Sequence, residues 1–195
     1  MYIPRHFEIC DSEEIFSFIE ANAFGQLIST VAGRHFSSHL PFLVSEDGRK
    51  IICHLARTNP QHSEITGQEV LLSFTGPHDY ISPSWYSGPG VPTWNYQAVH
   101  VYGQAREFDD TSELKKLVET LTHKYESRFD QPWQPNYQAA MLGAIVGIEI
   151  TISEVQCKYK LSQNRSAQDQ RKVIEKLKSI GSAELAEAME HNEEI

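Results

Sequence analysis

Apolar residues along the first part of the chain predict one helix and then a series of strands. Asp11 and Glu14 form the D-x-x-E pattern of a capping box, and the apolar residues after them recur at helical spacing. From residue 26 onward the apolar runs are strand-like, with turn residues such as Gly33 and Gly48 between them. We therefore predict strands over residues 26–31, 34–44 and 50–56, joined as an antiparallel meander.

The rest of the chain alternates between strands and helices by the same criteria. A short helix is predicted to begin after Asn59 and to reach residue 65, and the clearest helix begins after Asp110. Two C-terminal helices follow: one begins at Ser166 and has an apolar stripe that ends at Ile180, and a weak one covers residues 182–190 and frays at its acidic end. Further strands are predicted over residues 69–75, 96–108 and 144–160.

Six or seven antiparallel strands with peripheral helices are typical of a small closed or split β-barrel. We therefore predict a mainly β fold of the α+β class. The 195 residues are enough for one sizeable core, and no boundary requires a second one. We assign residues 1–165 to the barrel domain and residues 166–195 to a C-terminal helical extension packed on the same domain.

Composition limits the location and the partners. No apolar run approaches the roughly 20 residues of a membrane span, and the first residues lack the pattern of a signal peptide. We therefore expect a cytoplasmic protein without a membrane partner. The three cysteines are widely separated, which favours free thiols. The net charge of −9 disfavours direct DNA binding, because DNA-binding proteins neutralise phosphates with Lys and Arg.

Histidines are the candidate metal or haem ligands. His35 and His39 share a face of one predicted strand, and His54 lies on the next strand. Their spacing matches no zinc motif, and no carboxylate completes a ligand set, so we predict no metal site and expect partly buried, hydrogen-bonded histidines. Because no nucleophile motif such as G-x-S-x-G is present, no catalytic residue is assigned.

Residues 76–103 contain four prolines, two of the three tryptophans and four tyrosines. Proline excludes helix across most of this stretch, so we expect extended backbone and tight turns. The large flat side chains either pack a core or present a face to a flat partner. Their number exceeds what one small barrel readily encloses, which favours a homodimer.

Two polar segments lie next to predicted element ends. Arg57, Thr58 and Asn59 precede a helix, whose free N–H groups would suit a terminal phosphate. On the residues alone, a helix cap with a surface arginine is the more common interpretation. Residues 160–165 follow a strand and are rich in polar side chains, for which a solvated loop is the usual interpretation.

Four motifs in order, HLARTNPQ, GPHDYISPSWY, VPTWNYQAVHVYG and KLSQNRSAQD, resemble those of the PaiB family. The similarity runs from MYIPRHF at the start to the NRS segment. That family comprises FMN-binding split-barrel proteins described as negative transcriptional regulators. One local departure is His62, which stands after NPQ where the family pattern leads us to expect tryptophan.

The resemblance implies an FMN cofactor, a homodimer and a regulatory role. It also implies that the segment after residue 160 is an arm that reaches a flavin, across a dimer in one arrangement. The flavin-binding residues expected from it are Ser38, His39, His54, Leu55, Ala56, Arg57, Asn59, Ser82, Trp85, Thr93, Trp94, Asn95, Lys160, Gln163, Asn164 and Arg165.

Two other functions are compatible with the same fold. One is a flavin-dependent oxidoreductase of the pyridoxamine-phosphate-oxidase-like fold, with a second substrate above the ring. The other is a haem-binding split barrel that uses one of the histidines.

Overall fold

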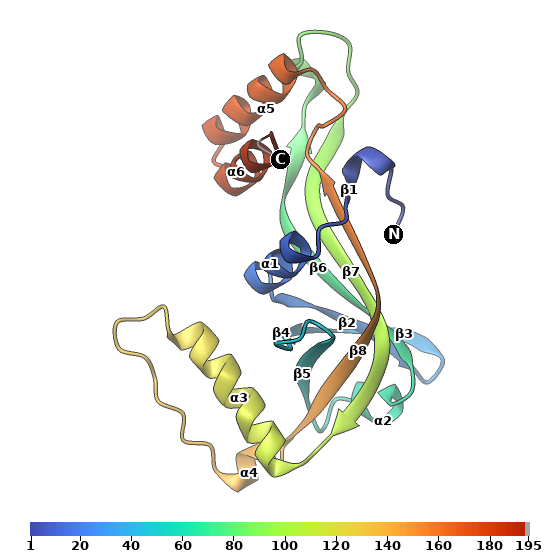
Figure 1. Ribbon diagram of the computed structural model, residues 1–195, viewed down its shortest axis with the longest axis vertical. Helices are drawn as coiled ribbons and strands as arrows, with labels where there is room; N and C mark the ends of the chain where they lie inside the picture. Colours follow the sequence, from blue (N-terminus) through green and yellow to red (C-terminus); the bar gives the residue numbers. More distant parts are fainter. Residues whose placement is uncertain (194–195) are drawn as a thin grey trace. The chain divides into compact units, whose positions relative to one another are not determined.

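The computed structural model of the chain describes residues 1–193 (Figure 1). Its strands are β1 (Glu8–Ile9), β2 (Phe24–Val31), β3 (Arg34–Pro41), β4 (Leu43–Val44), β5 (Lys50–Ala56), β6 (Glu69–Ile81), β7 (Thr93–Phe108) and β8 (Ile145–Lys160). Its helices are the short η1 (Arg5–Phe7) and η2 (Pro83–Trp85) and α1 (Ser12–Ala21), α2 (Gln61–Ile65), α3 (Thr111–Glu126), α4 (Ala139–Leu142), α5 (Ala167–Ser179) and α6 (Ala183–Glu193). The mainly β fold with peripheral helices is therefore confirmed.

Eight strands form one sheet in the order β3-β2-β6-β7-β8-β5-β4, and β1 pairs with β8. The predicted strand over residues 34–44 is divided into β3 and β4: β3 pairs with β2 and β4 pairs with β5, as the meander requires. The other partner of β5 is β8, where Cys53 lies opposite Ile148, and this pairing was not predicted. The reason for the division lies at the end of β3. Pro41 has no N–H for a ladder, and the next residue, Phe42, is buried with its ring 5.3 Å from the ring of Phe74.

The chain divides into two compact units. Unit 1 comprises Met1–Phe18, Thr75–Val99 and the chain from Gln156 onward, and unit 2 comprises Ile19–Phe74 and His100–Val155. The long strands β6, β7 and β8 each contribute residues to both units (Figure 1). The division into residues 1–165 and 166–195 stays a prediction.

The core of unit 2 follows from alternation along its strands. On β5, Ile51, Cys53 and Leu55 are buried, whereas the residues between them face the other side. Helix α3 covers part of unit 2 with Leu114 and Val118, which pack with Leu142 of α4. Gly147 of β8 is the residue that pairs with His54. The Phe108 ring packs so closely against Gly147 that a Cβ at this position would lie 2.1 Å from the ring, so only glycine fits here.

Unit 1 has buried apolar side chains of its own, which include residues of α5 and α6. The Phe18 ring lies 5.5 Å from the Tyr159 ring. Helix α5 begins at the predicted cap, where Ser166 accepts a hydrogen bond from the Asp169 N–H, and it packs on α6 and η2. Its stripe ends earlier than predicted, because Ile180 is 57% exposed beyond the last turn.

Helix α6 is longer than predicted, since it starts at Ala183 and continues to Glu193. Three of its apolar side chains, those of Leu185, Ala186 and Met189, are buried, which gives this helix a packing face that its composition had not indicated. The part of the predicted fraying end that covers residues 194 and 195 lies outside the described residues.

The histidines of β3 differ from expectation. His35 and His39 are exposed because β3 is the strand at the end of the sheet order, whereas His54 is half-buried. Within residues 1–193, no group of three or more His, Cys, Asp or Glu side chains is placed to hold a metal ion. No helix in that range is long and apolar enough to cross a membrane.

Candidate functional site

The residues expected to bind a flavin fall into two groups, one in each unit. The unit 2 group comprises residues of β3, β5 and the start of α2: Ser38, His39, His54, Leu55, Ala56, Arg57 and Asn59. The unit 1 group comprises residues around η2, the start of β7 and the end of β8: Ser82, Trp85, Thr93, Trp94, Asn95, Lys160, Gln163, Asn164 and Arg165.

Asn59 connects the turn before α2 with β3 in the unit 2 group. Its side-chain nitrogen donates a hydrogen bond to Ser38 Oγ over 2.9 Å, and its Oδ1 accepts one from the Gln61 N–H over 3.0 Å. The second bond is the predicted cap, although the residue that directly precedes the helix is Pro60. Helix α2 is only five residues long, so its own dipole adds little to anion binding.

Arg57 is held away from the start of α2. Its Nε donates a hydrogen bond to the Gly143 carbonyl over 3.0 Å, and its Nη2 donates to the Ile145 carbonyl over 3.3 Å. The guanidinium also lies 3.8 Å from Asp109 Oδ2, and the side chain is 41% exposed. Arg57 therefore anchors the chain after α4, and its predicted contact with a phosphate stays a prediction.

Alternation along β5 separates its three expected contacts. Leu55 is 1% exposed and points into the core, so only its backbone could reach a ligand. His54 points to the opposite face, and Ala56 is exposed at the end of the strand. On β3, the exposed ring of His39 stacks on Phe24 with ring centres 6.4 Å apart.

The sequence interpretation assigned no role to Gln61 or to His62. Gln61 is fully buried, and its Nε2 donates hydrogen bonds to the Leu27 carbonyl over 3.0 Å and to Ser29 Oγ over 2.9 Å. His62 lies 2.9 Å from Glu107 Oε2 through Nδ1 and 3.0 Å from the Arg57 carbonyl through Nε2. Their position directly after Asn-Pro was the available signal in the sequence. The hydrogen bonds of Gln61 and His62 hold the start of α2 in place.

Lys160 is the centre of the unit 1 group. Its Nζ donates hydrogen bonds to Thr93 Oγ1 over 2.6 Å and to the Trp94 carbonyl over 2.5 Å. Burial, together with the charges of Lys158 and Arg165, lowers the pKa of Lys160. Three cations thus gather in one place in a chain whose net charge is −9, an arrangement that an anion would stabilise.

The neighbours of Lys160 differ in how free their side chains are. Asn95 is fully buried, and its Nδ2 donates to Ser162 Oγ over 2.9 Å, so its side chain supports the group from inside. Gln163 closes its own turn by accepting from the Leu161 N–H and donating to the Tyr159 carbonyl. Asn164 is exposed.

Aromatic side chains complete the unit 1 group. The guanidinium of Arg165 lies 4.2 Å above the Tyr86 ring. Trp94 is 53% exposed and Tyr80 is 40% exposed, and their rings meet edge to face with centres 6.2 Å apart. Ser82 accepts a hydrogen bond from the Ser84 N–H at the start of η2, which contains the half-buried Trp85.

The fold is that of flavin-binding split-barrel proteins. The flavocytochrome Anf3 of Azotobacter vinelandii superimposes with a TM-score of 0.66 over 87% of this chain and 78% of that chain, at 15% identity. The FAD and haem binding protein of Mycobacterium smegmatis gives a TM-score of 0.66 over 84% of this chain and 78% of that chain, at 11% identity. At these identities the likeness shows the fold alone.

Sequence similarity shows the family. Residues 1–154 match the family model described as "Putative FMN-binding domain". The protease synthase and sporulation protein PAI 2 of Bacillus subtilis is 41% identical over 201 residues, which cover 97% of each chain. The chain therefore belongs to this FMN-binding family, and the resemblance to the PaiB family is confirmed. The Lys160–Arg165 segment lies beyond the residues that the family model matches.

Proposed function

We propose that this protein binds FMN in a site that two copies of the chain complete together. The observation that carries the proposal is the division of the expected flavin contacts into two groups, each of which contains hydrogen bonds between its own members. Asn59 and Ser38 connect the group in unit 2, and Lys160 connects Thr93 and Trp94 in unit 1. Unit 2 of one copy and unit 1 of the other would then supply opposite sides of the flavin.

The chemistry of the two groups fits the parts of FMN. Its phosphate is an anion, and the group of Lys158, Lys160 and Arg165 offers concentrated positive charge. Its ring system is flat and largely apolar, and the exposed rings of Tyr80 and Trp94 offer a surface of the same kind. When bound, the flavin supplies the capacity to accept and donate electrons.

A second copy also explains the exposed apolar side chains of unit 1. Trp94, Tyr80 and Val91 are 53%, 40% and 66% exposed, although large apolar side chains gathered on one surface favour association. A twofold dimer would cover them with the same surface of the partner or with the bound flavin. The homodimer and the cytoplasmic location remain proposals.

A regulatory role is proposed on the basis of family membership. The Bacillus subtilis relative is named a protease synthase and sporulation protein. With a net charge of −9, the protein is expected to regulate through its flavin or through a protein partner, without tight direct binding to DNA.

A complementation experiment tests the shared site. Lys160→Met damages the unit 1 group and Asn59→Ala damages the unit 2 group, so each purified variant alone should bind FMN weakly in a fluorescence titration. Subunits of the two variants are then exchanged by mixing. If the site is shared, random pairing restores about one quarter of the sites, because mixed dimers contain one intact site each.

The alternatives give different results. If every contact came from one chain, mixing the variants would restore nothing, and the proposal of a shared site would fail. If the full-length protein bound no FMN at micromolar concentration and showed no flavin absorption, the proposed function itself would fail. Sedimentation of the same samples reports whether the variants still form dimers.

A further inference from the structure

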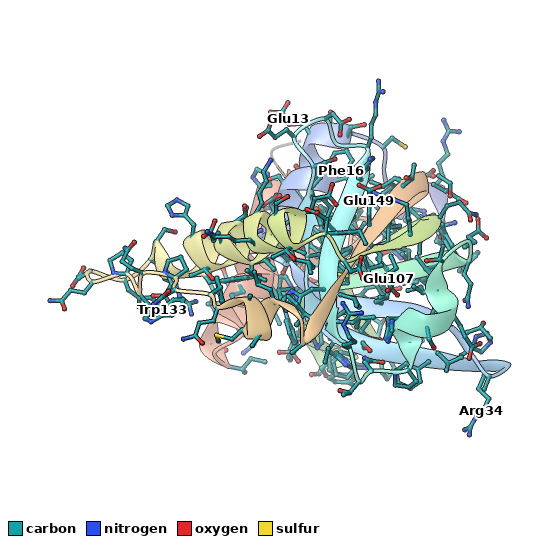
Figure 2. All side chains as sticks on the ribbon, turned by 90° about the horizontal axis from the view of Figure 1, so that it is seen from below. Glu13, Phe16, Arg34, Glu107, Trp133 and Glu149 are labelled. Atoms are coloured by element: carbon teal, nitrogen blue, oxygen red, sulfur yellow. The ribbon has the colours of Figure 1, made fainter. Side chains whose placement is uncertain are left out.

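A second site in unit 2 is a pocket of about 380 Å³ that lies among β5, α3, α4 and the loop after α3. This volume is within the range of pockets that hold small molecules. The residues that line it are Pro41, His54, Val118, Leu121, Thr122, Tyr125, Glu126, Trp133, Tyr137, Met141, Leu142 and Ile145. Figure 2 shows Trp133 on the loop between α3 and α4, away from the labelled strand residues Glu107 and Glu149.

Most of this lining is apolar or aromatic. The rings of Trp133 and Tyr137 meet edge to face, with centres 5.9 Å apart. Trp133 is 53% exposed and Met141 is 55% exposed, so the pocket is open to solvent on the side of these residues. Aromatic walls favour flat ligands, because stacked and edge-to-face contacts bury large apolar surfaces.

Two of the residues that line the pocket each have a buried polar atom without a hydrogen-bond partner: Nδ1 of His54 and Oη of Tyr125. Thr122, Glu126 and Tyr137 of the lining have hydrogen-bond partners. Thr122 Oγ1 donates to the Val118 carbonyl and lies 2.5 Å from the Tyr137 hydroxyl, and Glu126 accepts a hydrogen bond from the Trp133 N–H. A buried polar group without a partner destabilises a protein, so these two atoms are where a ligand would gain hydrogen bonds.

The pocket is already formed by packed elements. The Phe108 ring of β7 lies against Gly147 of β8, and Gly147 pairs with His54 of β5. Arg57 holds the chain after α4 through the carbonyls of Gly143 and Ile145. A ligand would therefore bind without first ordering these walls, which favours affinity.

Charge separates this pocket from a phosphate site. None of the residues that line it is Lys or Arg, and Glu126 adds negative charge. Burial lowers the pKa of His54, so its ring is neutral at neutral pH. The phosphate of FMN would lose its hydration here without gaining a counter-charge, which costs free energy. An uncharged molecule does not pay this desolvation penalty.

We propose that this pocket among β5, α3 and α4 binds a small, uncharged, flat molecule whose polar groups form hydrogen bonds with His54 Nδ1 and Tyr125 Oη. This ligand is distinct from FMN and is a second substrate or an effector of the protein, so the proposal removes His54 from the expected flavin contacts. A bicyclic lactam has the required chemistry, because it combines a flat ring system with one N–H donor and one carbonyl acceptor. The inference rests on contacts within unit 2 and does not require that the proposed FMN site be correct.

The test uses 2-quinolone as the probe and isothermal titration calorimetry of the full chain, with and without saturating FMN. We expect saturable binding that FMN does not displace. Tyr125→Phe removes one hydrogen-bonding group and keeps the ring, so it should weaken 2-quinolone binding between about twofold and tenfold. His54→Leu should weaken it by a similar factor.

Tyr137→Phe is the matched control. It also removes one hydroxyl from the lining, but that hydroxyl already has Thr122 as its partner, so 2-quinolone affinity should be unchanged. Thermal melting shows whether each variant is folded. Absence of saturable binding, equal affinity in Tyr125→Phe, His54→Leu and the unmodified protein, or displacement of 2-quinolone by FMN would each overturn the proposal.

Discussion

The side-chain amide of Asn59 donates a hydrogen bond to the hydroxyl of Ser38 over 2.9 Å and thereby connects the start of α2 with β3. These residues lie 21 positions apart in the chain. The contact places the end of β5 beside the exposed edge strand of the sheet. The position of the Asn59 side chain depends on the short helix that follows it. The buried side chain of Gln61 holds that helix in place.

Replacement of Gln61 by leucine should therefore weaken both folding and FMN binding. The variant leaves the Leu27 carbonyl without its buried donor, which costs about 1–3 kcal/mol of unfolding free energy. Urea denaturation measures this loss. Gln104→Leu is the control, because Gln104 is exposed and its replacement should change stability little. Equal stability of the two variants would show that Gln61 is not the anchor of α2.

Lys160→Met should weaken FMN binding by about tenfold to a hundredfold, because a hydrogen bond to a charged group contributes roughly 1.5–3 kcal/mol. Fluorescence titration with FMN measures the effect. Lys178→Met is the control in the same unit, since Lys178 pairs with Glu190 on the surface. Arg57→Ala separates the two candidate phosphate contacts. If it weakens FMN binding and Lys160→Met does not, the phosphate belongs at β5.

Trp94→Glu should convert a dimer into monomers at micromolar concentration, because a charge would replace an exposed apolar ring on the proposed dimer surface. Trp133→Glu is a closely matched control: both tryptophans are 53% exposed, but Trp133 lies on the loop after α3 in the other unit. Sedimentation velocity reports the masses. Dissociation of the Trp133 variant alone would place the dimer surface in unit 2.

Acid should remove the stabilising contribution of Glu149. Burial raises the pKa of this carboxyl, but hydrogen bonds from Lys50 and Arg106 lower it by more, so it lies below its ordinary value of 4.5. The contribution is therefore present above about pH 4.5 and is lost as the pH falls through the lowered pKa.

Glu149→Gln tests this dependence. At neutral pH the variant should lose about 1–2 kcal/mol of unfolding free energy, because Glu149 is 16% exposed and bonded to two cations. The difference from the unmodified protein should shrink toward low pH. Glu119→Gln breaks only an exposed pair with Lys115 and should have little effect at any pH. A constant difference across pH would contradict the assignment.

The purified protein should not bind duplex DNA tightly at physiological salt. Helix α5 contains the densest run of cations, but Lys172 donates to Ser87 Oγ and Lys178 pairs with Glu190. Little charge remains to offset the net −9 of the chain. Fluorescence anisotropy with a candidate promoter measures binding as salt is varied. Sequence-selective nanomolar binding near 150 mM salt, as specific DNA-binding proteins show, would contradict this expectation.

Local signals in the sequence predicted local structure. The caps at Asp110 and Ser166 have the predicted hydrogen bonds, and the start of α2 needed a shift of one residue only. The pairing of β5 with β8 was not predictable in this way. Its partner residues in β8 lie about 95 positions later, where Ile148 follows no signal that points back to Cys53.

The candidate site shows the same limit. The R-T-N-P pattern indicated where α2 starts, but not that Arg57 would reach the carbonyls of Gly143 and Ile145. The hydrogen bonds of Lys160 to residues 67 and 66 positions earlier likewise depend on how β7 and β8 align. The resemblance to a family named the residues of both groups, whereas only the fold shows which of them are neighbours.

Strands β6, β7 and β8 belong to both units, and this restricts where residues can be inserted into the chain or deleted from it. Unit 1 is assembled from three separate segments and unit 2 from two, so neither can be expressed as one uninterrupted fragment. Deletion of a single residue inside one of these strands would exchange its inward and outward side chains from that point on. Viable insertions and deletions should therefore be confined to connections such as residues 127–138, and a split-protein reporter should be cut there.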